Sequence, residues 1–308
     1  MAEKTHKINT WTERKERGSS RSIRFMHWLC RHRFQRIVHL LLYPIVAYFF
    51  LTSGDTKKAS RHFFLRATGA FSWLDHYKQL MCFSRSLVDR ISILMGESKH
   101  ITVHAHGREQ LIDAQKRGEG AILLGAHLGS FEACKGLVKE QSNIDVHIVA
   151  YHGSSQKIRS VLDEINPEMA KRVIDPSDPE AVFKMREVVE SGGFLAILAD
   201  RVGLGDKTVK VNFLGGDIQL PAGPYLLASI LRCPVYCFFG MRIDHNVYES
   251  HTVKLADQVM IPRNQRSEYL TKYAQQYANI LAEHAQNHPH NWFNFFEFWN
   301  ITEESNHL

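Results

Sequence analysis

The sequence predicts an α/β fold, with a mostly parallel sheet flanked by helices and an N-terminal membrane-associated helix. From residue 100 onward, short apolar runs alternate with helical patterns, as in chains that build such sheets. Two of these runs, 121–126 and 194–199, are apolar without alternation, which is typical of strands covered on both faces. The apolar stretch at 37–53 predicts the N-terminal helix.

Local signals place the other elements. Residues 59–96 contain few helix breakers and predict helix, and the alternation of apolar and polar residues at 101–106 predicts a half-exposed strand. Glycines and prolines set several of the remaining boundaries. We expect helices at 109–116, 130–140 and 155–165, one from Asp178 to Gly192, one opened by Pro221 and ending at Leu231, and one at 267–287, with strands at 146–150 and 234–239.

Charge divides the chain into regions. Residues 1–36 contain ten Lys or Arg and three acidic residues, whereas the remainder is close to neutral, although the whole chain carries +6. A nucleic-acid-binding face across the protein is therefore not expected, and the basic segment favours an anionic membrane surface. We predict a basic N-terminal region (1–36), a hydrophobic membrane anchor (37–53) and one further domain (54–308).

The predicted anchor is short and kinked. As a helix, residues 37–53 reach about 26 Å, less than a hydrocarbon core of roughly 30 Å, and Pro44 interrupts them. Basic residues flank the segment on both sides, whereas a spanning helix normally has its positive excess on one side. The pattern favours a helix embedded in one leaflet. A buried core helix is the alternative.

The stretch GAHLGSFE at 125–132 places a histidine five residues before a glutamate. The same spacing occurs at His104 and Glu109, so spacing alone has no meaning. His127, however, follows a buried strand and precedes a helix, at the sheet edge where open α/β folds bind ligands. His104 lies on the polar side of an alternating strand, where a solvated side chain is expected.

His127 and Glu132 suit general base catalysis. A carboxylate that folds back onto the imidazole would fix its tautomer and stabilise the protonated ring. Backbone N–H groups near Ser130 and Phe131 are candidates to hold an oxyanion. Such a site lacks its own nucleophile and suits acyl transfer from an activated donor such as a thioester.

Other chemistries have weaker signals. Ser130 lies in no GxSxG elbow, so a serine hydrolase is disfavoured. No HExxH is present, and His284, His288 and His290 have only loosely ligand-like spacing. We therefore expect no metal and no cofactor.

Several stretches in order resemble the bacterial lipid A late acyltransferase family, part of the wider lysophospholipid acyltransferase superfamily. GAHLGSFE resembles the HxxxxE block, and FLAILADR (194–201) the strand that ends in Asp-Arg. VNFLGGDIQLPAGPYLLA (211–228) resembles the Phe-Leu-Gly loop and helix start, and CPVYCFF (233–239) the strand after it.

The resemblance implies that residues 54–308 form an acyltransferase domain. This domain would transfer a fatty acyl chain from a thioester donor, acyl carrier protein or acyl-CoA, to a hydroxyl of a lipid A-type or other lipid acceptor. His127 would be the general base, with Glu132 as its orienting partner and no covalent intermediate. It also implies that the protein lies at the cytoplasmic face of the bacterial inner membrane, anchored by residues 37–53. The residues expected to bind substrate are Gly129, Ser130, Asp200, Arg201, Gly215 and Pro221.

Two departures from the family pattern leave alternatives open. LADRVG stands where glycerol-phosphate acyltransferases carry FxEGTRS, so that branch is disfavoured. HPHNWFNFFEFWN (288–300) stands where lipid A enzymes carry an arginine-rich ending. The acceptor can therefore be a lysophospholipid or an aryl-polyene-type lipid, and the aromatic residues can line an acyl channel or pack in the core. Arg201 can hold a phosphate or form a structural ion pair. A thioester or lysolipid hydrolase with the same pair, or a silent lipid-binding protein, also remains.

Overall fold

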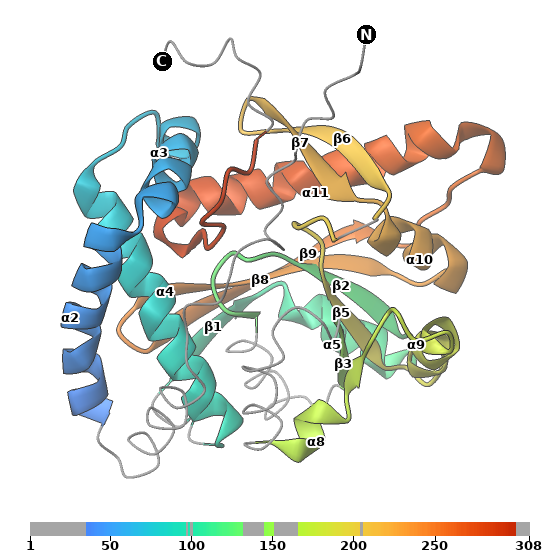
Figure 1. Cartoon of the computed structure of the whole chain (residues 1–308). Helices are drawn as coiled ribbons and strands as arrows, with labels where there is room; N and C mark the ends of the chain where they lie inside the picture. Colours follow the sequence, from blue (N-terminus) through green and yellow to red (C-terminus); the bar gives the residue numbers. More distant parts are fainter. Residues whose placement is uncertain are drawn as a thin grey trace, which may run out of the picture.

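The computed structural model describes residues 35–96, 98, 101–131, 145–150, 166–203 and 206–299. Within them, seven strands form one sheet in the order β1-β9-β8-β2-β5-β3-β4, and two more form a separate hairpin (Figure 1). Every neighbouring pair in the large sheet is parallel except β8 and β9. The strands are β1 (Thr102–His106), β2 (Ala121–Gly125), β3 (Val146–Val149), β4 (Val173–Ile174), β5 (Phe194–Leu198), β6 (Thr208–Phe213), β7 (Gly216–Pro221), β8 (Val235–Asp244) and β9 (Val247–Ala256).

Helices cover both faces of the sheet, as predicted. Alternate residues of β2 enter two different cores: Leu124 packs in the larger one with α9, α10, α11 and the hairpin, and Leu123 in the smaller one with α5. The fully buried β2 is thus a central strand, and its neighbour β5 is buried except at Leu198, which explains their unbroken apolar sequence. The helices are α2 (Gln35–Thr52), α3 (Gly54–Thr68), α4 (Trp73–Leu94), α5 (Arg108–Lys116), α8 (Pro167–Ala170), α9 (Ala181–Glu190), α10 (Gly223–Leu231) and α11 (Arg266–Asn287).

Three local expectations were incomplete or wrong. The segment 59–96 is two helices, because Gly69 ends α3 in the left-handed conformation and Ser72 begins α4 with a capping box. Pro221 does not open a helix: it pairs with Thr208 as the last residue of β7, and α10 begins at Gly223. The hairpin and β9 were not predicted. The expected helices at 130–140 and 155–165 fall almost entirely outside the described residues.

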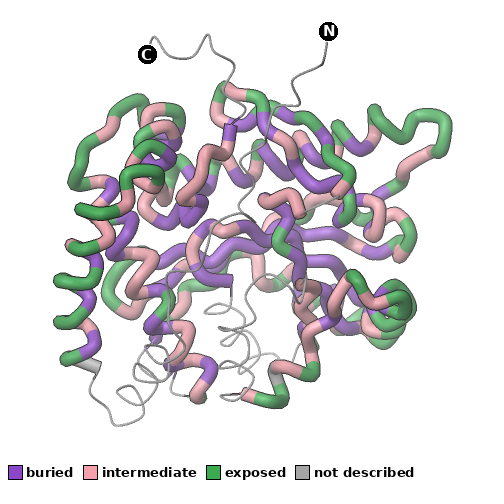
Figure 2. The backbone as a smooth tube through the Cα atoms, viewed as in Figure 1, coloured by how far each residue is buried: buried purple, intermediate pink, exposed green. Residues whose placement is uncertain are grey.

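Helix α2 is packed on one side only (Figure 2). Val38, Leu42 and Val46 recur at helical spacing and are buried against Leu80, Met81 and Val88 of α4. Among the described residues, no single helix has the length and apolar composition to cross a bilayer, and α2 and α3 satisfy that test only together, with a bend of 89° between them.

A buried ion pair fixes α4 to the sheet. The carboxylate of Asp89 accepts hydrogen bonds from Arg242 Nε at 3.2 Å and from the hydroxyl of Tyr248 at 2.7 Å. Asp89 and Arg242 are both buried, so each charge depends on the other for solvation. The contact joins α4 to β8 and β9 and so holds the helix that supports α2.

Candidate active site

The loop after β2 turns sharply because Gly129 has a φ of +71°, a conformation that side chains with a Cβ rarely adopt. A Cβ at this position would lie 2.0 Å from the carbonyl oxygen of Gly240 in β8. The close approach lets Ser130 N–H donate to that oxygen at 2.7 Å, and Gly129 N–H donates to the Asn291 carbonyl at 2.8 Å. Glycine is therefore required here, and the loop is held rigidly by β8 and by the segment after α11.

His127 lies on this loop beside Asp200, which follows β5, the parallel neighbour of β2. The Nδ1 atom of His127 is 3.0 Å from Asp200 Oδ1, and the backbone N–H of His127 donates to Oδ2 at 3.0 Å. The Asp200 side chain is fully buried, whereas 29% of the His127 side chain is exposed. The pair thus presents an accessible imidazole above a buried carboxylate.

A second residue holds Asp200 in place. Asn294, which is buried in the segment after α11, donates from Nδ2 to Asp200 Oδ2 at 2.8 Å and accepts from Arg201 Nε at 2.7 Å. Arg201 also donates to the carbonyl of Phe293 at 3.2 Å, and Phe293 N–H donates to the carbonyl of His127 at 2.8 Å. The residues near 293 therefore close a hydrogen-bonded ring around the His127–Asp200 pair.

The electrostatics of the pair favour a charged carboxylate. Burial alone raises the pKa of Asp200, but His127, Arg201 and Asn294 together hold it well below its ordinary value. Burial lowers the pKa of the Arg201 guanidinium to about 10, against the opposing influence of Asp200. Both groups are ionised at neutral pH, so Asp200 accepts hydrogen bonds and does not supply a proton.

This geometry selects one tautomer of His127. An ionised carboxylate accepts hydrogen bonds only, so the Nδ1 atom beside it bears the proton. The Nε2 atom then has a lone pair, and the imidazolium formed when it takes a proton is stabilised by Asp200. The arrangement is that of a general base with an orienting carboxylate.

The structure brings together five of the predicted site residues: His127, Gly129, Ser130, Asp200 and Arg201. Glu132 lies outside the described residues, so its pairing with His127 stays a prediction. The backbone N–H of Ser130 is bonded to Gly240, so the proposed oxyanion role does not suit that group, and the burial of Ser130 does not suit a hydrolase nucleophile.

The other two predicted residues lie on the β6–β7 hairpin. Gly215 forms its turn with a φ of +75°, next to Gly216, which approaches Trp299 and Arg66. Pro221 ends the same hairpin, in a sheet separate from the one that bears His127. Their role in substrate binding stays a prediction.

The aromatic segment 292–299 packs into the core in large part. Trp292 is fully buried and stacks on Phe63 at 5.0 Å and on Phe213 at 5.4 Å between ring centroids. The Trp299 indole N–H donates to the carbonyl of Phe213 at 2.8 Å. These contacts favour core packing over the acyl channel for the two tryptophans. His104, as expected, is exposed.

Sequence reasoning missed Asn294 and Asn291. The side chain of Asn291 accepts from Arg242 N–H at 2.8 Å and donates to the Arg242 carbonyl at 3.0 Å, which pairs this segment with β8. Asparagines within an aromatic, otherwise core-forming run are the signal that such polar contacts exist, since buried amides need partners.

A comparison with protein families identifies the family of the chain. A family model described as bacterial lipid A biosynthesis acyltransferase matches residues 80–300, a span that includes His127, Asp200 and Asn294. No curated protein matches the sequence significantly. Because the match covers well over half of the chain, the protein is an acyltransferase that belongs to the bacterial lipid A biosynthesis acyltransferase family.

Proposed function

We propose that the protein transfers a fatty acyl chain from a thioester donor to a hydroxyl of a lipid acceptor. Acyl carrier protein is the donor that we propose first. The observation that supports this mechanism most is the contact between His127 Nδ1 and the buried Asp200 carboxylate at 3.0 Å. The contact places the ring proton on Nδ1 and so makes Nε2 the nitrogen that can act as the base. Glu132 is a second carboxylate that can support the same ring.

The chemistry proceeds without a covalent enzyme intermediate. His127 Nε2 takes the proton of the acceptor hydroxyl as its oxygen attacks the thioester carbonyl, and the new C–O bond forms. The C–S bond then breaks, and the imidazolium returns its proton to the leaving thiolate. Asp200 remains ionised throughout and stabilises the imidazolium.

A basic cavity beside the site offers a place for the acceptor's head group. Its volume is about 620 Å³, and it lies between α2, α4, the end of β8 and the end of α11. Lys78, Arg85 and Arg242 line it, together with Asn291, whose carbonyl binds Gly129. Arg242 is already paired with Asp89, and Asp244 also lines the cavity, so Lys78 and Arg85 give it a small excess of positive charge. This excess favours an anionic head group, although the C-terminal segment lacks arginine.

Helix α2 supports membrane association, at the cytoplasmic face if the donor is acyl carrier protein. Its outward face is apolar, unlike that of an ordinary surface helix, and so fits a helix lying in the interface. Trp73 and Leu74 at the start of α4 are also exposed. The exposed apolar residues of α2 are Ile37, Leu40, Leu41, Tyr43, Ile45, Tyr48 and Leu51.

Charged substitutions on this face are expected to weaken binding to vesicles. Leu40 and Leu51 are 69% and 73% exposed, so the Leu40→Glu/Leu51→Glu variant should fold normally. Each leucine contributes about 1.5–3 kcal/mol when buried in lipid, so we expect at least a tenfold loss of co-sedimentation with anionic vesicles. Phe183→Glu on α9, where the side chain is 73% exposed, is the matched control. Equal losses in both variants would refute the role of α2.

Product analysis distinguishes transfer from hydrolysis. With an acyl thioester and total bacterial lipid, we expect mass spectrometry to show one lipid whose mass rises by a single acyl group. A thioesterase or lysolipid hydrolase would release free fatty acid instead and leave no heavier lipid. Comparing acyl carrier protein with CoA as the thiol carrier identifies the donor.

A further inference from the structure

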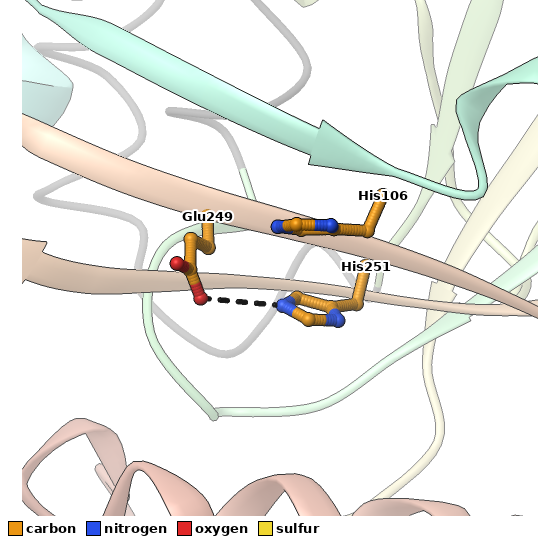
Figure 3. Close-up of side chains that lie close together, drawn as sticks. All are labelled: His106, Glu249 and His251. Carbon is orange, nitrogen blue, oxygen red and sulfur yellow. Dashed lines mark hydrogen bonds and ion pairs between the residues drawn. The ribbon is translucent and has the colours of Figure 1, made fainter.

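A cluster of imidazoles and a carboxylate lies on the edge of the sheet, on elements that do not bear His127. His106 ends β1, and its partner in the parallel register with β9 is His251. Glu249 precedes His251 by two residues on β9 and therefore points to the same face. Figure 3 shows both rings extending from neighbouring strands toward Glu249.

The donor atoms have the spacing of a metal coordination shell. One ligand atom each from His106, Glu249 and His251 can be chosen so that all three lie within 4.8 Å of one another. Glu249 Oε2 is 3.5 Å from His251 Nε2 and 3.8 Å from Nε2 of His288, at the end of α11. Donor atoms around a tetrahedral Zn²⁺ lie about 3.4 Å apart.

Direct hydrogen bonds between Glu249 and the two histidines explain these distances less well than a shared metal ion does. A charge-assisted hydrogen bond between imidazolium and carboxylate is normally about 2.7–2.9 Å long, which both Glu249 contacts exceed. The His106 and His251 rings are stacked with centroids 4.6 Å apart, an arrangement that two protonated rings would oppose. Neutral imidazoles instead offer lone pairs, the usual ligands of zinc.

A neighbouring histidine packs against the cluster without belonging to it. The His284 ring lies 5.0 Å from that of His251, and its Nδ1 atom is 2.8 Å from the carbonyl oxygen of Ile280, to which it donates. That bond fixes the ring's tautomer. His290, which sequence spacing grouped with His284 and His288, lies elsewhere, 3.3 Å from Asp75.

We propose that His106, Glu249, His251 and His288 bind a divalent transition-metal ion, with Zn²⁺ as the best match. The site is separate from the His127 base, although His288 also lines the cavity proposed for the acceptor head group. Gly129 pairs with Gly240, which pairs with Ser250 between the two β9 ligands. Two strand spacings, roughly 10 Å, thus separate it from the His127 loop. The ion would tie β1 and β9 to the end of α11, directly before the segment that holds Asp200.

The test is a zinc titration of the metal-stripped full chain in competition with a chromophoric chelator. We expect the wild type to bind one ion that the His106→Gln/His251→Gln variant binds at least tenfold more weakly, and zinc to raise the wild-type melting temperature. His147→Gln is the matched control, because His147 also lies on a strand beside a carboxylate, Asp145, at 3.0 Å. Tetrahedral Co²⁺ absorption should appear in the wild type and control only.

Zinc uptake that is equal in the wild type and the double variant would overturn the proposal, as would no uptake at all. The first result would assign the ion to other histidines of the chain, which number 18 in total. Melting in the presence of chelator shows whether the variant is folded. Glu249→Gln, which keeps the side-chain volume, should weaken zinc binding in the same direction and gives an independent measure.

Discussion

Replacing His127 with alanine should lower kcat for acyl transfer by about a thousandfold or more, because the acceptor hydroxyl loses the base that takes its proton. The fold should persist. Only the side chain beyond Cβ is removed, it is partly exposed, and the backbone contacts of the loop to Gly240 and Asn291 do not involve it. Single-turnover transfer from an acyl thioester measures the effect, and circular dichroism measures the fold.

The chain supplies a matched control for this variant. His147 on β3 also contacts a carboxylate, with 3.0 Å between its Nε2 atom and Asp145, but β3 is not a neighbour of β2 and does not bear the loop. His147→Ala should therefore transfer acyl groups at the wild-type rate. Full activity of His127→Ala would show that another group is the base, and the mechanism proposed for this loop would be wrong.

Replacing Asp200 with asparagine should lower kcat by about 10²–10⁴-fold while KM changes little. The amide has the same shape, but its NH₂ group beside Nδ1 would favour the tautomer in which Nε2 bears the proton and cannot accept another. The neutral amide also fails to stabilise the imidazolium. Steady-state kinetics at several acceptor concentrations separates the kcat effect from binding.

Comparison with Glu132→Gln decides which carboxylate orients the base. Asp145→Asn changes the exposed carboxylate beside His147, serves as the control and should leave kcat at the wild-type value. A large loss in Glu132→Gln with wild-type kcat in Asp200→Asn would restore the pairing that sequence spacing suggests. Losses in both would mean that the two carboxylates act together on His127.

Much of the central sheet could be predicted from the sequence because its buried strands are uninterrupted apolar runs. Residues 121–126 and 194–199 are apolar throughout since helices cover both faces, and α5 and α11 begin and end within one residue of the predicted bounds. The β6–β7 hairpin escaped prediction although its first strand alternates in burial. Its turn residues, Leu214 and Gly215, were instead assigned to a loop by family resemblance.

The site was predictable in part. His127 stood out because it follows a buried strand, whereas Asp200 was expected only through the family resemblance, and then as a substrate-binding residue and not as the partner of His127. The distance of 3.0 Å between them depends on strand order, which brings β2 next to β5 although 73 residues separate the two side chains. Asn294 is 94 residues from Asp200, and no local sequence pattern predicts a contact between them.

The contacts of Asn291, Phe293 and Asn294 have a consequence for synthesis. These residues bond to Gly129, His127 and Asp200, so the earlier part of the chain contains the base and its carboxylate without the groups that close the ring around them. Chains emerge from the ribosome N-terminus first and fold in that order. A nascent polypeptide therefore displays the exposed apolar side of α2 long before it is able to acylate anything.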